Sequence, residues 1–170
     1  MKTKLSIAIL ALMLFVSMSS FAQSPLPKGR NQFNAGVGFS NYGIPIYLGF
    51  DHAVHNNVSL GGEVTYRNYY HSWKTYRLDR NVIGLHFIAN YHFNSIMRIP
   101  SNFDFYAGLG ASFYIWDGDD YYDYHEDEIS GLRLRGQVGG RYYWSKNWGL
   151  NLEFGGGGFS DGRLGISYRY

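Results

Sequence analysis

The sequence predicts an all-β fold: an eight-stranded antiparallel up-and-down transmembrane β-barrel that follows a cleaved signal peptide. Three observations predict it, namely an apolar leader at the N-terminus, eight segments in which apolar and polar residues alternate, and charges confined to one face of those segments. The chain also holds 22 glycines and 19% aromatic residues at a mean hydropathy of -0.26. This composition suits strands with one lipid-facing and one polar face.

The first 22 residues have the pattern of a signal peptide. Two lysines precede an apolar run from Leu5 to Val16, and the small residues Ser20 and Ala22 stand where a signal peptidase cuts. A run of about twelve apolar residues is short for a helix that spans a bilayer. We therefore predict three parts: residues 1–22 as the signal peptide, 23–30 as a periplasmic N-terminal extension, and 31–170 as the barrel domain.

Charge and cysteine content exclude other classes of protein. Without the two leader lysines, the 15 Lys and Arg of the whole chain fall to 13, which equals the 13 Asp and Glu. A balanced charge does not indicate nucleic acid as a partner. The chain has no cysteine, so no disulfide closes the fold. Beyond residue 22, no apolar stretch approaches the length of a membrane helix.

The first four barrel segments alternate with a period of two, as strands with one apolar face do. Their apolar faces run in turn from Phe33 to Phe39, from Ile44 to Phe50, from Val58 to Tyr66, and from Ile83 to Phe93.

The last four segments repeat this pattern. Their apolar faces run from Phe105 to Ile115, from Leu132 to Tyr142, from Trp148 to Phe154, and from Leu164 to Tyr170. The links between segments alternate in length, since residues 55–57 and 145–147 are turn-like whereas 69–80 and 117–130 are long. We predict that the long links are extracellular loops, and that residues 94–102 form a longer turn on the periplasmic side.

The position of the charges decides which face meets lipid. None of the roughly forty positions on the apolar faces is Asp, Glu, Lys or Arg, as expected where a midplane Arg or Lys costs about 2 to 4 kcal/mol. A soluble sandwich would place its polar face outward. We therefore predict that the apolar face is outside and that the sheet closes, because an open edge would leave backbone groups unpaired in hydrocarbon. Inward glycines make room for large polar side chains.

The inward faces are expected to hold a buried network of ion pairs and hydrogen bonds, because unpaired charges in a narrow lumen are costly. Its predicted members are Glu63, Arg67, Asp104, Arg133, Arg135, Arg141, Glu153 and Arg169. Arginines outnumber acids in this set, which leaves a gated, narrow ion path as the functional alternative.

The long links are the predicted contact surface for other molecules, because they combine charges with exposed aromatic residues. Its predicted members are Trp73, Lys74, Arg77, Asp119, Asp120, Tyr121 and Tyr122. Residues 117–128 carry seven acids, yet their spacing does not match a calcium-binding loop. We predict a solvated acidic loop, no metal site and no cofactor.

Catalytic patterns are weak. His71 with Ser72, and His92 with Ser95, are the only near neighbours that could begin a Ser/His/acid set. By alternation His92 points into the lumen, and His71 falls in a predicted loop. We therefore predict no enzymatic activity.

The chain resembles the small outer-membrane barrels of Gram-negative bacteria typified by the transmembrane domain of OmpA and by OmpX. The resemblance rests on the signal peptide, the eight alternating segments and the ending Leu164-Ile166-Tyr168-Tyr170. It implies a monomer in the cell outer membrane, in contact with lipid and lipopolysaccharide. It also implies that Tyr168 and Tyr170 are the signal read by the barrel assembly machinery, after escort by periplasmic chaperones.

Three hypotheses about function follow. The first is a structural or surface-interaction barrel that acts through its extracellular loops. The second is a narrow ion-conducting pore through the polar lumen. The third, which the residues favour least, is a lipid-modifying barrel enzyme.

Overall fold

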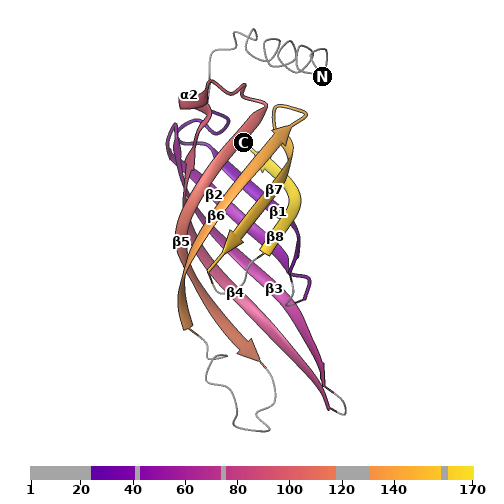
Figure 1. The fold of residues 1–170 in the computed structure, drawn as a ribbon. Helices are drawn as coiled ribbons and strands as arrows, with labels where there is room; N and C mark the ends of the chain where they lie inside the picture. The colour runs from indigo at the N-terminus through magenta and orange to yellow at the C-terminus, as the bar shows by residue number, and fades with distance from the viewer. Residues whose placement is uncertain (1–23, 41–42, 74–75, 118–130, 158–160) are drawn as a thin grey trace, which may run out of the picture.

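The computed structural model of the chain is a single closed barrel, and it describes residues 24–40, 43–73, 76–117, 131–157 and 161–170 (Figure 1). Each strand pairs antiparallel with its neighbours in sequence, and β8 pairs with β1. The strands are β1 (Asn31–Phe39), β2 (Ile46–His55), β3 (Val58–Trp73), β4 (Tyr76–His92), β5 (Phe103–Asp117), β6 (Gly131–Tyr143), β7 (Trp148–Gly156) and β8 (Asp161–Arg169). The predicted eight-stranded up-and-down barrel is therefore confirmed. The predicted signal peptide lies outside the described residues.

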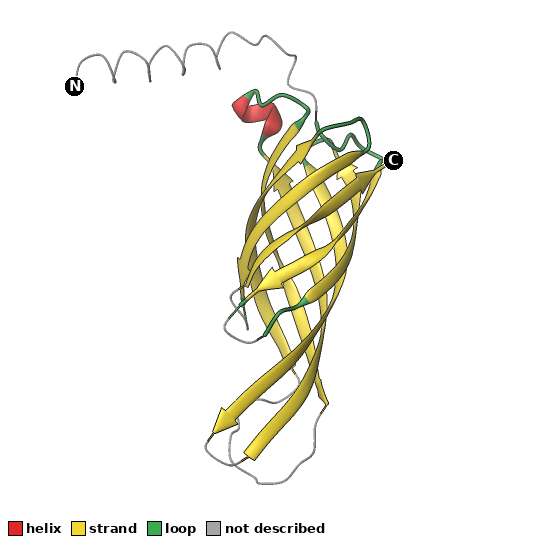
Figure 2. Ribbon diagram, turned by 90° about the vertical axis from the view of Figure 1, so that its right-hand side faces the viewer, coloured by secondary structure: helices red, strands yellow, loops and turns green. Residues whose placement is uncertain are grey.

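The two ends of the barrel differ in their connections. At one end lie the C-terminal residue Tyr170, the connections after β2, β4 and β6, and a short helix, α2 (Asn94–Met97) (Figure 2). We call this the turn end. The opposite end, where β1, β3, β5 and β7 finish, is called the loop end. The longer periplasmic turn predicted over residues 94–102 thus contains one turn of helix.

The wall of the barrel is taller on one side. Strands β3 to β5 have 15 to 17 residues, whereas β1, β7 and β8 have nine. The pairing of β6 with β7 begins only at Gly136, while its pairing with β5 extends to Gly131. The β3 to β6 side therefore extends beyond the rest of the barrel at the loop end, as the long β3 and β4 arrows show (Figure 1).

The prediction of a long loop over residues 69–80 is wrong. Tyr69 pairs with Arg80 and the register continues to Trp73 opposite Tyr76, so that only residues 74–75 separate β3 from β4. Aromatic residues have a high preference for strands, and the backbone pairing continues past the charged positions Arg80, Asp79 and Arg77. The second predicted loop begins after Asp117, where β5 ends, and its residues 118–130 lie outside the described part of the chain.

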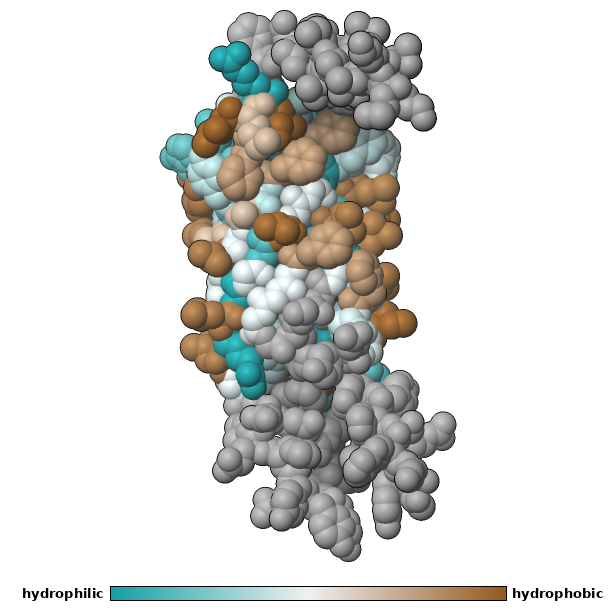
Figure 3. Space-filling view, viewed as in Figure 1, coloured by the Kyte–Doolittle hydropathy of each residue, from teal (hydrophilic) through white to brown (hydrophobic). Residues whose placement is uncertain are grey.

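The apolar face is on the outside of the barrel, as predicted. Leu134, Leu109 and Phe87 expose 85%, 76% and 72% of their surface, whereas Arg67, Arg163 and Asp104 are almost fully buried. Figure 3 shows hydrophobic side chains projecting along both flanks of the visible face. Because an exposed apolar band around a polar interior suits lipid and not water, this sheet spans a membrane. The described residues form no helix of the length and apolarity that a transmembrane helix requires.

Glycines make room for the side chains inside the barrel. A Cβ added at Gly139 would collide with the Tyr106 ring, and one added at Gly84 would collide with Thr65 and His86. Outward Gly136 is different, since a Cβ there would meet only Leu109 Cδ2 at 3.7 Å. Gly84 and Gly139 are therefore required by the packing of the lumen.

Candidate functional site in the barrel lumen

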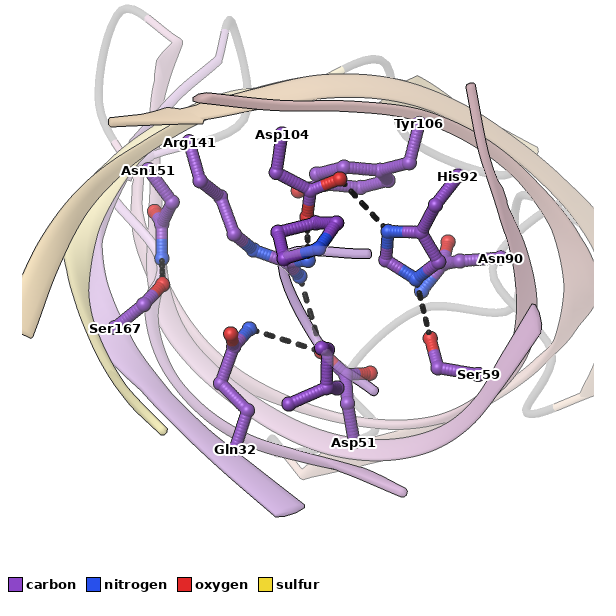
Figure 4. Close-up of polar contacts among 12 residues, drawn as sticks. Gln32, Asp51, Ser59, Asn90, His92, Asp104, Tyr106, Arg141, Asn151 and Ser167 are labelled. Atoms are coloured by element: carbon purple, nitrogen blue, oxygen red, sulfur yellow. Dashed lines mark hydrogen bonds and ion pairs between the residues drawn. The ribbon is translucent and has the colours of Figure 1, made fainter. Parts of the chain in front are cut away.

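One arginine joins opposite walls of the barrel near the turn end. Arg141 on β6 donates from Nη1 to Asp104 Oδ2 and from Nη2 to Asp51 Oδ2, each at 3.0 Å (Figure 4). All three residues are buried. Charged hydrogen bonds of this kind are the strong ones in a protein interior. Because β2 lies across the lumen from β5 and β6, the pair of carboxylates holds Arg141 between the two walls.

His92 extends this cluster along β4. Its Nδ1 lies 2.8 Å from Asp104 Oδ1, and its Nε2 lies 3.0 Å from Ser59 Oγ (Figure 4). The order of serine, histidine and aspartate is that of a hydrolase triad. However, the Ser59 side chain is fully buried and Asp104 is already bound to Arg141, so the array holds three strands together. We call Asp51, Ser59, His92, Asp104 and Arg141 the turn-end network.

His92 and Ser95, which are near neighbours in the sequence, do not bind each other. Ser95 instead donates its hydroxyl to Asn57 Oδ1 at 2.6 Å in the neighbouring turn. The histidine ring points into the lumen, as alternation predicted, while Ser95 lies on exposed α2.

A chain of amides and hydroxyls supports Asp51 from β1, β7 and β8. Tyr47 donates to Asn151 Oδ1 at 2.6 Å, Asn151 donates to Ser167 Oγ at 3.0 Å, and Ser167 donates to Asn34 Oδ1 at 2.7 Å. Asn34 then donates to Asp51 Oδ2 at 2.9 Å. Each step crosses to another strand, so the chain ties the short wall to the turn-end network.

Tyr106 connects this network to the half of the lumen nearer the loop end. Its ring lies under Arg141, with the guanidinium carbon 4.1 Å from the ring centroid. Its hydroxyl donates to Glu153 Oε2 at 2.8 Å. Gly139 opposite Tyr106 in the β5–β6 register leaves the space that this ring occupies.

The second charged cluster, which we call the loop-end network, contains Glu63, Arg135, Glu153 and Arg163. Arg163 forms an ion pair with Glu63 and lies 3.7 Å from Glu153 Oε1. Arg135 Nη2 is also 3.7 Å from Glu153 Oε1, which is too long for a direct hydrogen bond. Within the part of the chain that the structure covers, Nη1 and Nη2 of Arg135 have no hydrogen-bond partner.

A small polar cavity separates the two networks. Its volume is about 20 Å³, and its charged lining residues are Asp51, Glu63, Arg141 and Glu153. A cavity of this size has room for about one water molecule. The lumen at this level is therefore filled by side chains, with space for a single solvent molecule between the charged layers.

The N-terminal segment closes the turn end. Pro25 and Leu26 are buried, with Leu26 only 1% exposed. Arg169 donates to the Pro25 carbonyl at 2.5 Å while its guanidinium carbon lies 3.7 Å from the Tyr143 ring centroid. Gly29 donates its backbone N–H to Ala53 O at 2.8 Å. The predicted N-terminal extension thus includes a segment that is packed into the mouth of the barrel.

The structure distributes the eight predicted lumen residues among several places. Asp104 and Arg141 meet at the turn end, and Arg169 lies at the mouth. Glu63, Arg135 and Glu153 lie together in the loop-end network. Of the other two predicted members, Arg67 is buried and donates to Ser40 Oγ at 3.3 Å, whereas Arg133 is exposed on β6.

Sequence reasoning missed Asp51, His92 and Arg163 as members of the charged clusters. Asp51 follows Phe50 on the opposite face of β2, and Arg163 precedes Leu164 on the opposite face of β8. Extending the alternation by one residue at each strand would have found both. The role of His92 depends on its partners on β3 and β5, which alternation does not reveal.

The predicted surface residues and C-terminal tyrosines have different outcomes. Trp73 ends β3 and Arg77 lies in β4, while Lys74 and residues 119–122 lie outside the described chain. Tyr168 contacts the Trp148 ring at 4.7 Å between centroids, and Tyr170 stacks on Phe33 at 5.8 Å. Across the described ranges, no group of three or more His, Asp or Glu side chains is arranged to hold a metal ion.

The fold is similar to those of solved transmembrane barrels. No protein-family model and no curated protein sequence matches the chain. The outer membrane protein OprG from Pseudomonas aeruginosa has a TM-score of 0.64 at 10% identity, over 89% of this chain and 99% of OprG. Ail of Yersinia pestis has a TM-score of 0.56 at 13% identity, over 84% and 100% of the two chains.

The fold is also similar to that of a designed protein. A de novo transmembrane β-barrel has a TM-score of 0.56 at 16% identity, over 84% of this chain and 97% of the design. Because a designed protein has the same fold, similarity to these structures does not by itself indicate a specific activity for this chain. With the apolar exterior, the fold is that of the small outer-membrane barrels of Gram-negative bacteria. The more specific resemblance to OmpA and OmpX stays a prediction.

Proposed function

We propose that this chain is a non-enzymatic integral protein of the outer membrane, in which the barrel is a filled scaffold and the loop end contacts other molecules. The filled lumen is the observation that carries the proposal. Arg141 binds carboxylates on opposite walls, and the cavity beside it holds only about 20 Å³. An eight-stranded barrel filled in this way is a rigid support. Lipid and lipopolysaccharide surround it, and it acts as a monomer.

The taller β3 to β6 wall supports the assignment of contacts to the loop end. In this wall the pairing of β6 with β5 continues to Gly131, whereas the pairing of β6 with β7 stops at Gly136, so the strand ends of this wall lie beyond the short wall. The sequence from the end of β5 onward is acidic, with seven Asp and Glu among residues 117–128. Ail, one of the similar structures, has been solved with a sulfated heparin analogue. The acidic connection of this chain favours a partner of the opposite, basic charge.

The test is to shorten the two tall hairpins without changing the barrel. In one variant, residues 69–80 are replaced by Asn-Gly, which suits a two-residue hairpin turn, and residues 118–129 are deleted. Cells that display the protein are then tested for adhesion to surfaces coated with polylysine, heparin or lipopolysaccharide. We expect cells that display the parent protein to adhere to polylysine more strongly than cells that lack the protein. The shortened variant should insert normally but lose this adhesion.

A matched control separates charge from length. Replacing the seven acids of residues 117–128 by Asn and Gln keeps the connection intact and should abolish adhesion to polylysine just as shortening does. If the shortened variant inserts and binds every surface as the parent does, the proposed role of the loop end is wrong.

A narrow channel is the second candidate, and the loop-end network is the observation that favours it. Glu153 Oε1 and both terminal nitrogens of Arg135 have no hydrogen-bond partner within the described residues, so this layer has capacity to bind water. Exchange of partners among these groups would open a file of water molecules. Planar-bilayer recordings of the refolded protein test it, because Glu63→Ala and Glu153→Ala should change the conductance of a true path. Unchanged or absent conductance excludes gating by this network.

Biogenesis gives Tyr168 and Tyr170 their proposed role. We propose that both are read by the barrel assembly machinery after periplasmic chaperones deliver the chain. A Tyr170→Ala variant should accumulate less folded protein in cells, while refolding in detergent stays normal because stacking on Phe33 is peripheral. Leu164→Ala, at another outward position of β8, is the control. If Tyr170→Ala assembles in cells as the parent does, Tyr170 is not part of this signal.

A further inference from the structure

The exposed charged side chains that the structure describes at the turn end are all basic. Four exposed side chains contribute: Lys28 and Arg30 of the N-terminal segment, Arg98 after α2, and Lys146 in the turn between β6 and β7. We call these four residues the basic rim. They belong to three separate connections, so they surround the mouth of the barrel and do not form a patch on one side.

Acidic side chains are absent from the exposed surface of this end. Among residues 24–31, 52–59, 92–104, 142–149 and 168–170, the only Asp or Glu is Asp104, which is fully buried in the lumen and bound to Arg141. Asp51, one layer deeper, is also buried and bound to Arg141. The acids near this end are therefore neutralised inside the barrel, and they do not offset the rim.

Arg169 differs from the four rim residues although it lies beside them. Its guanidinium donates to the carbonyls of Pro25 and Lys146 at 2.5 and 2.8 Å and stacks on Tyr143. These contacts use the side chain to hold the mouth closed. By contrast, no ion pair joins any basic-rim side chain to an acid within the residues described.

Apolar side chains accompany the rim. Ile96 and Met97 of α2 expose 68% and 64% of their surface, and Trp144 and Trp148 beside Lys146 expose 52% and 47%. Tryptophan and long apolar side chains next to Lys and Arg are typical of the boundary between hydrocarbon and headgroups. A soluble partner would instead be expected to meet a localised surface on one side of the mouth.

We infer that the basic rim binds the phosphate headgroups of anionic phospholipids in the leaflet around the turn end, while Ile96, Met97, Trp144 and Trp148 enter the adjoining acyl region. Lys and Arg near an anionic membrane surface attract it electrostatically. The ring arrangement gives each of several lipids around the barrel a basic partner. This inference rests on the proposed placement in the membrane and is independent of what the loop end binds.

The test compares lipid preference in nanodiscs. Wild-type protein is refolded in phosphatidylcholine nanodiscs that contain trace spin-labelled phosphatidylglycerol or phosphatidylcholine, and the relative association of the two labels is measured by electron spin resonance. We expect a preference for phosphatidylglycerol of about fivefold, the ratio that one Lys or Arg near the surface contributes. This preference should fall toward one in 1 M salt, because the Debye length shrinks to about 3 Å.

The decisive variant neutralises the rim as Lys28→Gln, Arg30→Gln, Arg98→Gln and Lys146→Gln together. Its preference should fall to about one while its heat-modifiable mobility on a gel shows a folded barrel. The matched control removes the same number of charges at the other end, as Lys74→Gln, Arg77→Gln, Arg80→Gln and Arg133→Gln, and should keep the wild-type preference. The inference is overturned if the rim variant prefers phosphatidylglycerol as strongly as the wild type does. It is also overturned if the control variant loses this preference as fully as the rim variant does.

Trimming the loop-end hairpins distinguishes this inference from the proposed function. The trimmed barrel should lose adhesion and keep its lipid preference, whereas the rim variant should keep adhesion and lose its lipid preference.

Discussion

The two charged networks of the lumen differ in how completely their buried charges are paired and hydrogen-bonded. At the turn end, Arg141 has two carboxylates at 3.0 Å, and one of them also binds His92 at 2.8 Å. At the loop end, Arg163 forms a direct ion pair with Glu63, but Arg135 is 3.7 Å from its nearest carboxylate oxygen, on Glu153. Burying a charge is tolerable only when it is paired and hydrogen-bonded. The turn end meets that condition and supports stability, whereas the loop end leaves capacity for water.

The position of each network suits this difference. The turn-end network lies beneath Pro25 and Leu26, which close the mouth, so it has to satisfy its charges with protein partners. The loop-end network lies nearer the loop end, and its carboxylates Glu63 and Glu153 are 11% and 12% exposed, so water can complete its hydrogen bonds. We expect substitutions in the first network to cost stability and substitutions in the second to change hydration.

The largest expected effect is that of Arg141→Met. It leaves Asp51 and Asp104 buried without their shared cation, so the free energy of unfolding should fall by about 3 to 5 kcal/mol. Guanidinium unfolding in lipid vesicles, followed by tryptophan fluorescence, measures this. A loss below about 1 kcal/mol would mean that the remaining partners of the two carboxylates suffice.

Leu26→Ala tests whether the closed mouth is part of the stable barrel. Truncating a fully buried leucine should lower the unfolding free energy by about 2 to 4 kcal/mol. Lys28→Ala, two residues away and exposed, should change it by less than about 0.5 kcal/mol. Equal effects of both substitutions would show that the segment does not stabilise the barrel.

Gly139→Ala tests the space that holds Tyr106 between the networks. The new Cβ would collide with the Tyr106 ring, and such overpacking typically lowers stability by about 1 to 3 kcal/mol. The same denaturation experiment on Gly136→Ala is the control, because its Cβ meets only Leu109 at 3.7 Å. If the control loses as much stability, the cost comes from the backbone and not from the lumen.

Arg135→Met should have the smallest effect, below about 1 kcal/mol. Glu153 keeps the Tyr106 hydroxyl as a donor and Arg163 nearby, and replacing a buried ion by a hydrophobic residue of similar volume is often neutral. Unfolding in vesicles measures it beside Arg141→Met. A loss as large as that of Arg141→Met would remove the distinction between the two networks.

The sequence by itself determined which face of each strand is apolar, and hence the barrel and its inward charges. Alternation is a local property, so Arg135, Arg141 and Glu153 could be assigned to the interior from their immediate neighbours. The same local argument failed at residues 69–80, which were predicted as a long loop although the backbone pairing of β3 with β4 continues to Trp73 and Tyr76.

Only the tertiary structure decided which inward groups meet. Arg141 and Asp51 are 90 residues apart, and Tyr106 reaches Glu153 across 47 residues. Whether residues so far apart in sequence come into contact depends on the stagger of the closed sheet, which is a property of all eight strands together. The burial of Leu26 has the same origin, because a short segment after the leader has no apolar pattern of its own until the barrel mouth exists to receive it.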